Sequence, residues 1–205
     1  MTTTTISSEY KLAYFVKSAG KAVEFPRPHG LECCILGRSN VGKSSFINHA
    51  LNQPHLAKTA KMPGKTCCAN FFKLNETLTW VDLPGYGFAR ASQSEKERWS
   101  RLIADYCSQR ENLGGIIWLL DVRHPGLPAD LEAYAWLKKL KKPILPVLTK
   151  CDTITRGDLH NTQRLFARSF PLFTHFVPFT TKDNQARFSF WKSCDAWFET
   201  WQPNE

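Results

Sequence analysis

Residues 37–44 read Gly-Arg-Ser-Asn-Val-Gly-Lys-Ser, a pattern of glycines, lysine and hydroxyl suited to gripping a chain of phosphates. The glycines let backbone N–H groups curl around a phosphate, and a helix that begins here adds the positive end of its dipole. Lys43 supplies a mobile charge for the β- and γ-phosphates, and the Ser44 hydroxyl is a candidate Mg²⁺ ligand. We call this segment the P-loop. We expect nucleotide contacts from Gly37, Arg38, Ser39, Asn40, Val41, Gly42, Lys43 and Ser44.

A second candidate segment is Asp82-Leu83-Pro84-Gly85, which follows the apolar stretch 78–81. An Asp at the end of a buried strand can hold Mg²⁺ through a water molecule. Gly85 can bring its N–H to the γ-phosphate with no side chain in the way. Asp-x-Pro-Gly also forms ordinary turns, and only the position downstream of the P-loop favours the nucleotide interpretation. We expect contacts from Asp82, Leu83, Pro84 and Gly85.

The base is expected to be read by Thr149-Lys150-Cys151-Asp152, which follows the apolar stretch 144–148. The Asp152 carboxylate can accept from both N1–H and the exocyclic amino group of guanine, a donor pair that adenine lacks. The Lys150 stem can lie over the purine face. We call residues 149–152 the base motif, and it favours GTP and GDP over ATP.

Two weaker segments complete the set. Pro63-Gly64-Lys65-Thr66 precedes the expected hairpin, and a hydroxyl there can bind Mg²⁺ only while a γ-phosphate is present, which describes a switch. We expect nucleotide contacts from Gly64, Lys65, Thr66, Cys67 and Cys68, with Thr66 as a Mg²⁺ ligand. Phe179-Thr180-Thr181 closes the last expected strand and can offer backbone N–H groups to the guanine carbonyl. Each is a generic loop by itself, and the order of all five segments supports them.

For catalysis we expect Lys43, Thr66 and Gly85 to act on the γ-phosphate. Related switches place a Gln after this glycine to orient the attacking water, but here the residue is Tyr86. A phenol cannot replace the amide, so we expect slow hydrolysis that a group from outside the loop accelerates. One candidate is a ribosomal partner, and another is K⁺, because Asn40 occupies a P-loop position that resembles the K⁺-ligating Asn of related potassium-activated GTPases. The alternative for Asn40 is an amide that stabilises the loop.

Strands and helices alternate along the chain. Strands are expected at residues 31–36, 69–74, 78–83, 116–120, 144–148 and 175–179. Helices are expected at 44–51, from 92 onward, and at 128–140, 155–170 and 188–201. Ser92 and Glu95 form a capping box, and Thr155 to Asp158 is a second candidate cap. The pattern predicts an α/β fold of the P-loop NTPase type, with a mostly parallel six-stranded sheet, one antiparallel edge strand and helices on both faces.

Length and composition fit a single domain. We expect residues 1–9 to be disordered and residues 10–205 to form one GTP-binding domain. No apolar run reaches the ~18 residues of a membrane span and no signal peptide is evident, so we expect a cytoplasmic monomer without membrane contact.

The seven cysteines lack a Cys-x-x-Cys pair and are expected to be reduced. The aromatic stretch 188–201 is expected to be core rather than a ribosome-facing surface.

The formal charge of +9 favours a polyanionic partner such as RNA or the ribosome. The charge is spread along the chain and says nothing about sequence readout.

The longer strings around these motifs resemble the EngB (YihA/YsxC) family of bacterial GTPases, in the TrmE-Era-EngA-EngB-Septin-like class. The resemblance rests on residues 37–48, 63–66, 149–152 and Asp-Leu-Pro-Gly-Tyr-Gly-Phe-Ala at 82–89, and extends from about residue 10 to the C-terminus. It implies Mg²⁺ dependence, a role with rRNA and ribosomal proteins in assembling the large ribosomal subunit, and a need for the protein in cell division and septation. The resemblance of Asn40 to the K⁺-ligating Asn of potassium-activated GTPases implies K⁺ as a second cofactor.

Three alternatives stay open. A P-loop kinase or ATPase would have no use for the base motif. A regulatory GTPase could act instead on another RNA process such as tRNA modification. An RNA-binding module could retain a P-loop that has no function.

Overall fold

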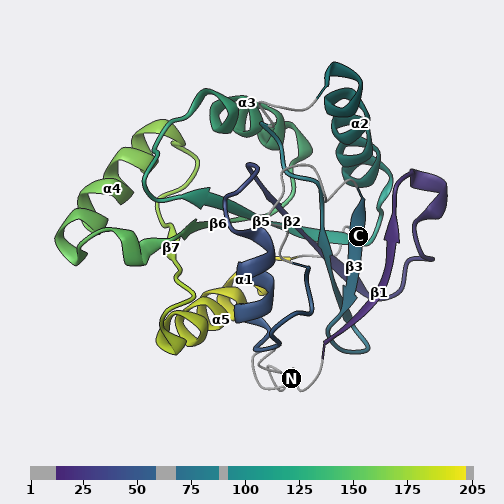
Figure 1. Cartoon of the computed structure of the whole chain (residues 1–205), viewed down its shortest axis with the longest axis horizontal. Helices are drawn as coiled ribbons and strands as arrows, with labels where there is room; N and C mark the ends of the chain where they lie inside the picture. The colour runs from purple at the N-terminus through teal and green to yellow at the C-terminus, as the bar shows by residue number, and fades with distance from the viewer. Residues whose placement is uncertain (1–12, 59–67, 88–91, 202–205) are drawn as a thin grey trace.

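A computed structural model describes residues 13–58, 68–87 and 92–201. Its centre is a seven-stranded sheet in the order β1-β3-β4-β2-β5-β6-β7 (Figure 1). The strands are β1 (Tyr14–Ala19), β2 (Leu31–Gly37), β3 (Ala69–Lys73), β4 (Leu78–Asp82), β5 (Leu113–Asp121), β6 (Ile144–Thr149) and β7 (Val177–Pro178). The expected α/β fold class is therefore confirmed.

The sheet has one strand more than the six expected, because β1 pairs antiparallel with β3. β3 also runs antiparallel to β4, so β3 is the reversed strand but does not form the edge. The remaining neighbours pair in parallel, and the carboxyl ends of β2, β4, β5 and β6 lie along one edge of the sheet. Ligands of such sheets bind beyond these ends, where the P-loop and the base motif begin.

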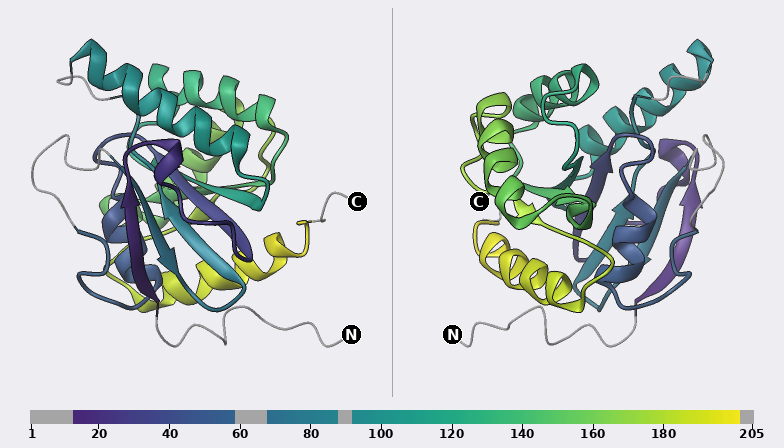
Figure 2. Two further views of the ribbon diagram at one scale, coloured as in Figure 1. Left: turned by 90° about the vertical axis from the view of Figure 1, so that its right-hand side faces the viewer. Right: turned by 60° about the vertical axis from the view of Figure 1, so that its left-hand side comes forward.

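Five helices cover the two faces of the sheet (Figure 2). They are α1 (Lys43–Ala50), α2 (Gln93–Gln109), α3 (Pro128–Leu137), α4 (Arg156–Ser169) and α5 (Asn184–Phe198). Cys33 and Ile35 of β2 pack with α1 and α5, whereas Cys34 and Leu36 pack with α2, α3 and α4. This alternation is why the central strands are apolar on both faces.

Local signals fixed several helix starts. The capping box of Ser92 and Glu95 is present, and Thr155 caps α4 by accepting from the Asp158 N–H, as expected. α5 begins earlier than expected, because the Asp183 side chain accepts from the Gln185 N–H and caps it. Three short 3-10 turns occur at Ala22–Glu24, Lys138–Leu140 and Cys151–Thr153.

Most of the aromatic residues near the C-terminus belong to the core. Phe190, Trp191 and Trp197 are buried, although Phe188 is 60% exposed. Gly114 and Gly115, the second and third residues of β5, make room for this packing, since a Cβ on Gly115 would lie 2.5 Å from the Trp201 ring. Within the described ranges, no helix has the length and apolar character needed to cross a bilayer.

Candidate nucleotide-binding site

The P-loop connects the end of β2 to the start of α1. Gly42 caps α1 with φ 103°, and Asn40 has φ 63°, so both occupy the left-handed region that glycine and asparagine tolerate best. The Val41 N–H donates to the Arg38 carbonyl at 3.1 Å and tightens the turn. Gly37 has no room for a side chain, because a Cβ there would lie 2.9 Å from the Leu119 carbonyl oxygen. The loop is therefore held in one compact shape in front of a helix N-terminus.

Residues 82–86 lie directly against the P-loop. The Tyr86 N–H donates to the Gly37 carbonyl at 3.3 Å, and the Tyr86 carbonyl accepts from the Ser39 N–H at 2.9 Å. A Cβ on Gly85 would lie 3.1 Å from the Ser39 nitrogen, so any side chain there would press against the backbone of the P-loop. These contacts continue the β2–β4 pairing beyond the ends of the strands.

The Asp82 carboxyl group ends β4 opposite Lys43, whose Nζ lies 4.0 Å from Asp82 Oδ1. Burial raises the pKa of Asp82, and the charge of Lys43 opposes that shift. Asp82 Oδ1 is buried and makes no hydrogen bond within the described part of the chain. A buried carboxylate oxygen is costly unless something satisfies it. A water molecule of a Mg²⁺ hydration shell is such a partner, so the donor set fits the ion.

Thr149 and Lys150 connect the base motif to the P-loop. Thr149 Oγ1 donates to the Val41 carbonyl at 2.8 Å. Lys150 Nζ donates to the Asn40 carbonyl at 2.7 Å, and its backbone has φ 60°. The aliphatic stem of Lys150 therefore extends from the end of β6 to the P-loop, where it can form one wall of a base site.

Asp152 and the segment 179–181 also come together. The Thr180 hydroxyl donates to Asp152 Oδ1 at 2.7 Å, so that side chain holds the carboxylate in place. The Cys151 N–H donates to the Phe179 carbonyl at 3.2 Å, and the Phe179 N–H donates to the Leu148 carbonyl at 2.8 Å. Two segments that sequence reasoning assigned separately to the base thus form one structure.

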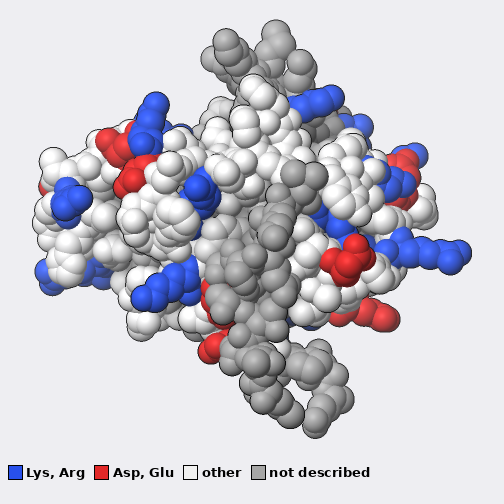
Figure 3. Space-filling model, turned by 90° about the horizontal axis from the view of Figure 1, so that it is seen from below, with Lys and Arg blue, Asp and Glu red and all other residues white. Residues whose placement is uncertain are grey.

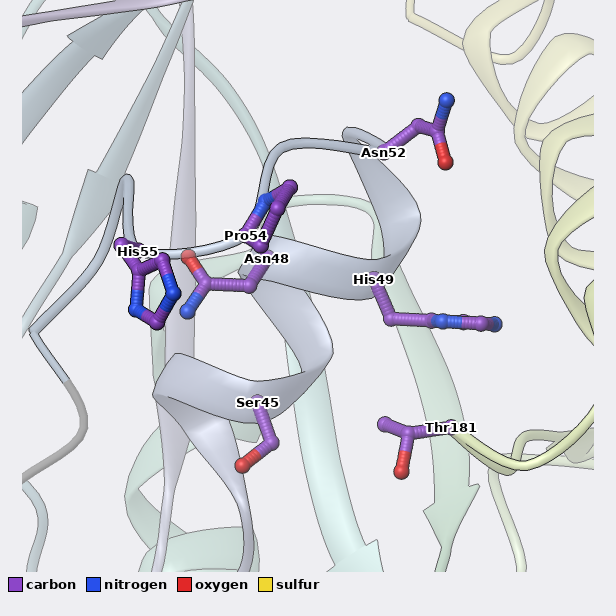
Figure 4. Close-up of a pocket in the computed structure, with 7 residues that line it drawn as sticks. All are labelled: Ser45, Asn48, His49, Asn52, Pro54, His55 and Thr181. Carbon is purple, nitrogen blue, oxygen red and sulfur yellow. The ribbon is translucent and has the colours of Figure 1, made fainter.

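A hollow of about 310 Å³ borders this region on the outer side of α1 (Figure 4). Its lining residues are Ser45, Asn48, His49, Asn52, Pro54, His55 and Thr181. Ser45 adjoins the candidate Mg²⁺ ligand Ser44, and Thr181 adjoins Thr180. Most of the lining belongs to α1 and the loop that follows it, and Thr181 alone among the lining residues was expected to contact the nucleotide, so the hollow lies beside α1 rather than in the candidate nucleotide site.

Asp121 is a residue of this site that the sequence analysis missed. It ends β5 with its side chain 2% exposed, and its Oδ2 accepts from Lys150 Nζ at 2.8 Å. Arg123 also donates to both oxygens of Asp121, at 2.8 and 2.7 Å. Burial by itself raises the pKa of Asp121, but these hydrogen bonds outweigh it and hold the pKa well below its usual range. An Asp at the end of a buried strand was the signal available in the sequence.

Tyr86 points away from the P-loop. Its hydroxyl donates to Asp130 Oδ1 at 2.8 Å and accepts from Trp118 Nε1 at 2.7 Å. Burial raises the pKa of Tyr86, so the phenol keeps its proton. The hydroxyl is thus occupied by α3 and β5, which agrees with the expectation that it does not stand in for a catalytic Gln.

Some expected site residues are not placed. Pro63, Gly64, Lys65, Thr66 and Cys67 lie outside the described residues. Cys68 precedes β3 and lies beside Gly20, whose added Cβ would be 3.7 Å from the Cys68 sulfur. The other cysteines that the structure describes carry free thiols, most of them buried.

The sequence matches the model of a family described as 50S ribosome-binding GTPase over residues 32–150. A probable GTP-binding protein EngB of Streptococcus sanguinis is 45% identical over 145 residues, which cover 71% of this chain and 74% of the relative. The corresponding protein of Lactiplantibacillus plantarum is 37% identical over 183 residues, which cover 88% of this chain and 93% of the relative.

Solved structures share the fold. The crystal structure of a probable GTP-binding protein EngB superposes with a TM-score of 0.64 at 22% identity, covering 80% of this chain and 97% of that one. Aquifex aeolicus Era bound to GDP and AlF4⁻ also superposes with a TM-score of 0.64, at 19% identity, covering 87% of this chain and 59% of that one. At these identities the likeness concerns the arrangement of strands and helices.

Proposed function

The chain belongs to the EngB family of GTP-binding proteins, and we propose that it is a slow GTPase switch in the assembly of the large ribosomal subunit. As a member of a GTPase family it binds GTP and hydrolyses it. The residue roles, the rate, the ribosomal partner and the link to cell division are proposals. One observation supports the nucleotide site most strongly: Lys150 of the base motif donates to the carbonyl of Asn40 in the P-loop.

The proposed phosphate site uses the P-loop, with backbone N–H groups and the N-terminus of α1 facing the β- and γ-phosphates. Lys43 neutralises the negative charge that develops on the bridging oxygen of the leaving GDP as the bond from this oxygen to the γ-phosphorus breaks. Gly85 presents its backbone N–H to a γ-phosphate oxygen. Each of these groups binds and orients, which is most of what phosphoryl transfer requires of a protein.

GTPases generally depend on Mg²⁺, and this chain has suitable ligands. We assign Ser44 and Thr66 as direct ligands and Asp82 as a ligand through water. When bound, the ion neutralises charge on the phosphate oxygens. Asp82 Oδ1 is buried and has no hydrogen-bond partner among the residues that the structure describes, which supports its assignment.

Guanine specificity is assigned to Asp152, which accepts from two donors of the base while Thr180 fixes the carboxylate. Backbone N–H groups of the segment 179–181 contact the guanine carbonyl. The hydrogen bond from Thr180 to Asp152 supports a preformed acceptor. This arrangement favours a GTPase over the alternative of a P-loop ATPase or kinase.

Hydrolysis is proposed to be slow without a partner, because Tyr86 occupies the position of the water-orienting Gln and its hydroxyl is directed to Asp130 and Trp118 instead. The missing group comes either from the ribosome or from K⁺ at Asn40. The left-handed backbone of Asn40 also supports the simpler role of stabilising the loop.

The proposed partner is the large ribosomal subunit, with both its rRNA and its proteins. The matching family is described as 50S ribosome-binding, and the chain has a net charge of +9. Lysine and arginine side chains are spread over the face in Figure 3 rather than gathered into one patch. We place the protein in the cytoplasm as a monomer needed for division and septation, with tRNA modification as the alternative process.

Co-sedimentation with 50S particles tests this proposal. We expect the protein to pellet with 50S particles in the presence of a non-hydrolysable GTP analogue and to be released with GDP. Binding that ignores the nucleotide would favour a plain RNA-binding module. Absence from the pellet in every nucleotide state would contradict the ribosomal role.

A further inference from the structure

Tyr86 connects three parts of the molecule through polar contacts. Its backbone bonds to Gly37 and Ser39 of the P-loop. Its hydroxyl bonds to Asp130 of α3 and to Trp118 of β5. Tyr86 immediately follows Gly85. Because Gly85 has no side chain to anchor it, its position is set by the residues on either side of it. The place of Gly85 beside the P-loop therefore depends on both halves of Tyr86.

The far end of this connection is rigid. Asp130 is 2% exposed and lies in the first turn of α3, where its N–H donates to the Leu127 carbonyl at 2.9 Å. Trp118 is fully buried, and its ring stacks on Tyr134 at 6.2 Å and meets Phe170 edge-on at 4.9 Å. The Tyr86 hydroxyl is thus held by two groups whose own positions are fixed by packing.

A buried carboxyl group in this place needs an explanation. Burying a carboxyl group costs free energy, and an apolar residue would pack against Trp118 without that cost. Asp130 accepts from Tyr86, while Trp118 donates to the same hydroxyl, so both the donor and the acceptor capacity of the phenol are used. Such a pair of contacts fixes the direction of the hydroxyl as well as its place.

We propose that Asp130 is a positioning residue for GTP hydrolysis, which acts through Tyr86 to hold Gly85 in register with the P-loop. The inference rests on the proposed role of the Gly85 N–H at the γ-phosphate. Only the γ-phosphate depends on Gly85, whereas GDP is held by the P-loop and the base motif. A substitution that releases the Tyr86 hydroxyl therefore lowers kcat and leaves the affinity for GDP unchanged. A purely structural role would lower stability without this distinction.

Tyr86→Phe tests the proposal, since it removes the hydroxyl and keeps the ring. We expect kcat to fall about tenfold, because the substitution removes both hydrogen bonds of the hydroxyl, while the Kd for GDP stays within about twofold. Tyr134→Phe is the matched control. The Tyr134 ring stacks on the same Trp118, but the hydroxyl that the substitution removes accepts from the Leu172 N–H at 3.0 Å, away from the P-loop. We expect the control to keep the wild-type kcat.

Substitutions of Asp130 separate position from charge. Asp130→Asn keeps an acceptor for the Tyr86 hydroxyl, so we expect kcat within about twofold of wild type. Asp130→Ala removes the acceptor and should match Tyr86→Phe, and it replaces Tyr86→Phe if that variant does not fold. The proposal is overturned if Tyr86→Phe or Asp130→Ala keeps the wild-type kcat, if the control loses as much, or if GDP affinity falls in parallel. Failure of the wild type to bind GTP would instead refute the proposed function.

Discussion

Lys150 Nζ lies 2.7 Å from the carbonyl oxygen of Asn40, although the two residues are 110 positions apart in the chain. The contact joins the loop after β6 to the loop after β2. Asp121 holds the same ammonium from the end of β5 at 2.8 Å. Three neighbouring strands thus end in one connected polar group, which fixes the distance between the candidate phosphate and base sites.

Removing Asp121 should loosen the base site. We expect Asp121→Ala to weaken GDP and GTP binding equally, each by about tenfold. Lys150 beside the base loses a charged hydrogen-bond partner, whereas the protein groups that bind the phosphates keep all of theirs. Titration with fluorescently labelled GDP and with fluorescently labelled GTP measures the two dissociation constants. Glu132→Ala, an exposed change of the same charge on α3, is the control. A loss confined to GTP would contradict this role.

Asp121 should also affect stability at low pH. Its pKa in the folded state is below the ordinary value, so the folded state binds the proton less readily than the unfolded chain. The stabilisation is present in full above the ordinary Asp pKa of about 3.9 and is lost as the pH falls below it. Thermal unfolding between about pH 6 and pH 3 should show a smaller acid loss for Asp121→Asn than for wild type. Equal losses would indicate that Asp121 is not the titrating group.

The base assignment predicts a change of specificity. Asp152→Asn should bind GTP about a hundredfold more weakly and gain affinity for xanthosine triphosphate, whose C2 oxygen accepts from an amide. Competition against labelled GDP measures both effects. Asp158→Asn, which makes the same change in the first turn of α4, should retain guanine specificity. Undiminished GTP binding by Asp152→Asn would show that another group reads the base.

The dependence on K⁺ distinguishes two roles of Asn40. If Asn40 ligates the ion, turnover is higher in KCl than in NaCl at equal ionic strength, and Asn40→Gly loses the difference. Glycine suits the left-handed backbone at φ 63°, so this substitution leaves the loop shape intact. Equal wild-type rates in the two salts would leave only the loop-stabilising role.

The sequence alone was sufficient for the elements whose signals are local. A stretch of a few residues is enough to predict each of the following: the P-loop, the buried strands β5 and β6, and the caps at Ser92 and Thr155. β1 was missed because its side chains are mostly exposed, so it shows no apolar alternation, and its partner β3 lies about fifty residues away. Pairing of an edge strand over such a distance is a tertiary effect.

The candidate site divides in the same way. Lys43 and Asp152 were assigned from the spacing of their motifs, and their roles stay predictions. Asp121 and Asp130 were missed because their partners, Lys150 and Tyr86, are 29 and 44 positions away and meet them only in the folded chain. The Asp183 cap of α5 was readable from the sequence, and overlooking it placed that helix start too late.

Calorimetric titration of Mg·GTP, Mg·GDP and Mg·ATP into the wild-type protein measures whether the P-loop and the base motif form a guanine-nucleotide site. We expect binding of GTP and GDP, little or no heat with ATP, and loss of binding in Lys43→Ala, because that change removes the cation beside the phosphates. Lys139→Ala, an exposed change of the same charge, should bind like wild type. No heat with either guanine nucleotide, or equal affinity for ATP, would show that these two segments do not form such a site.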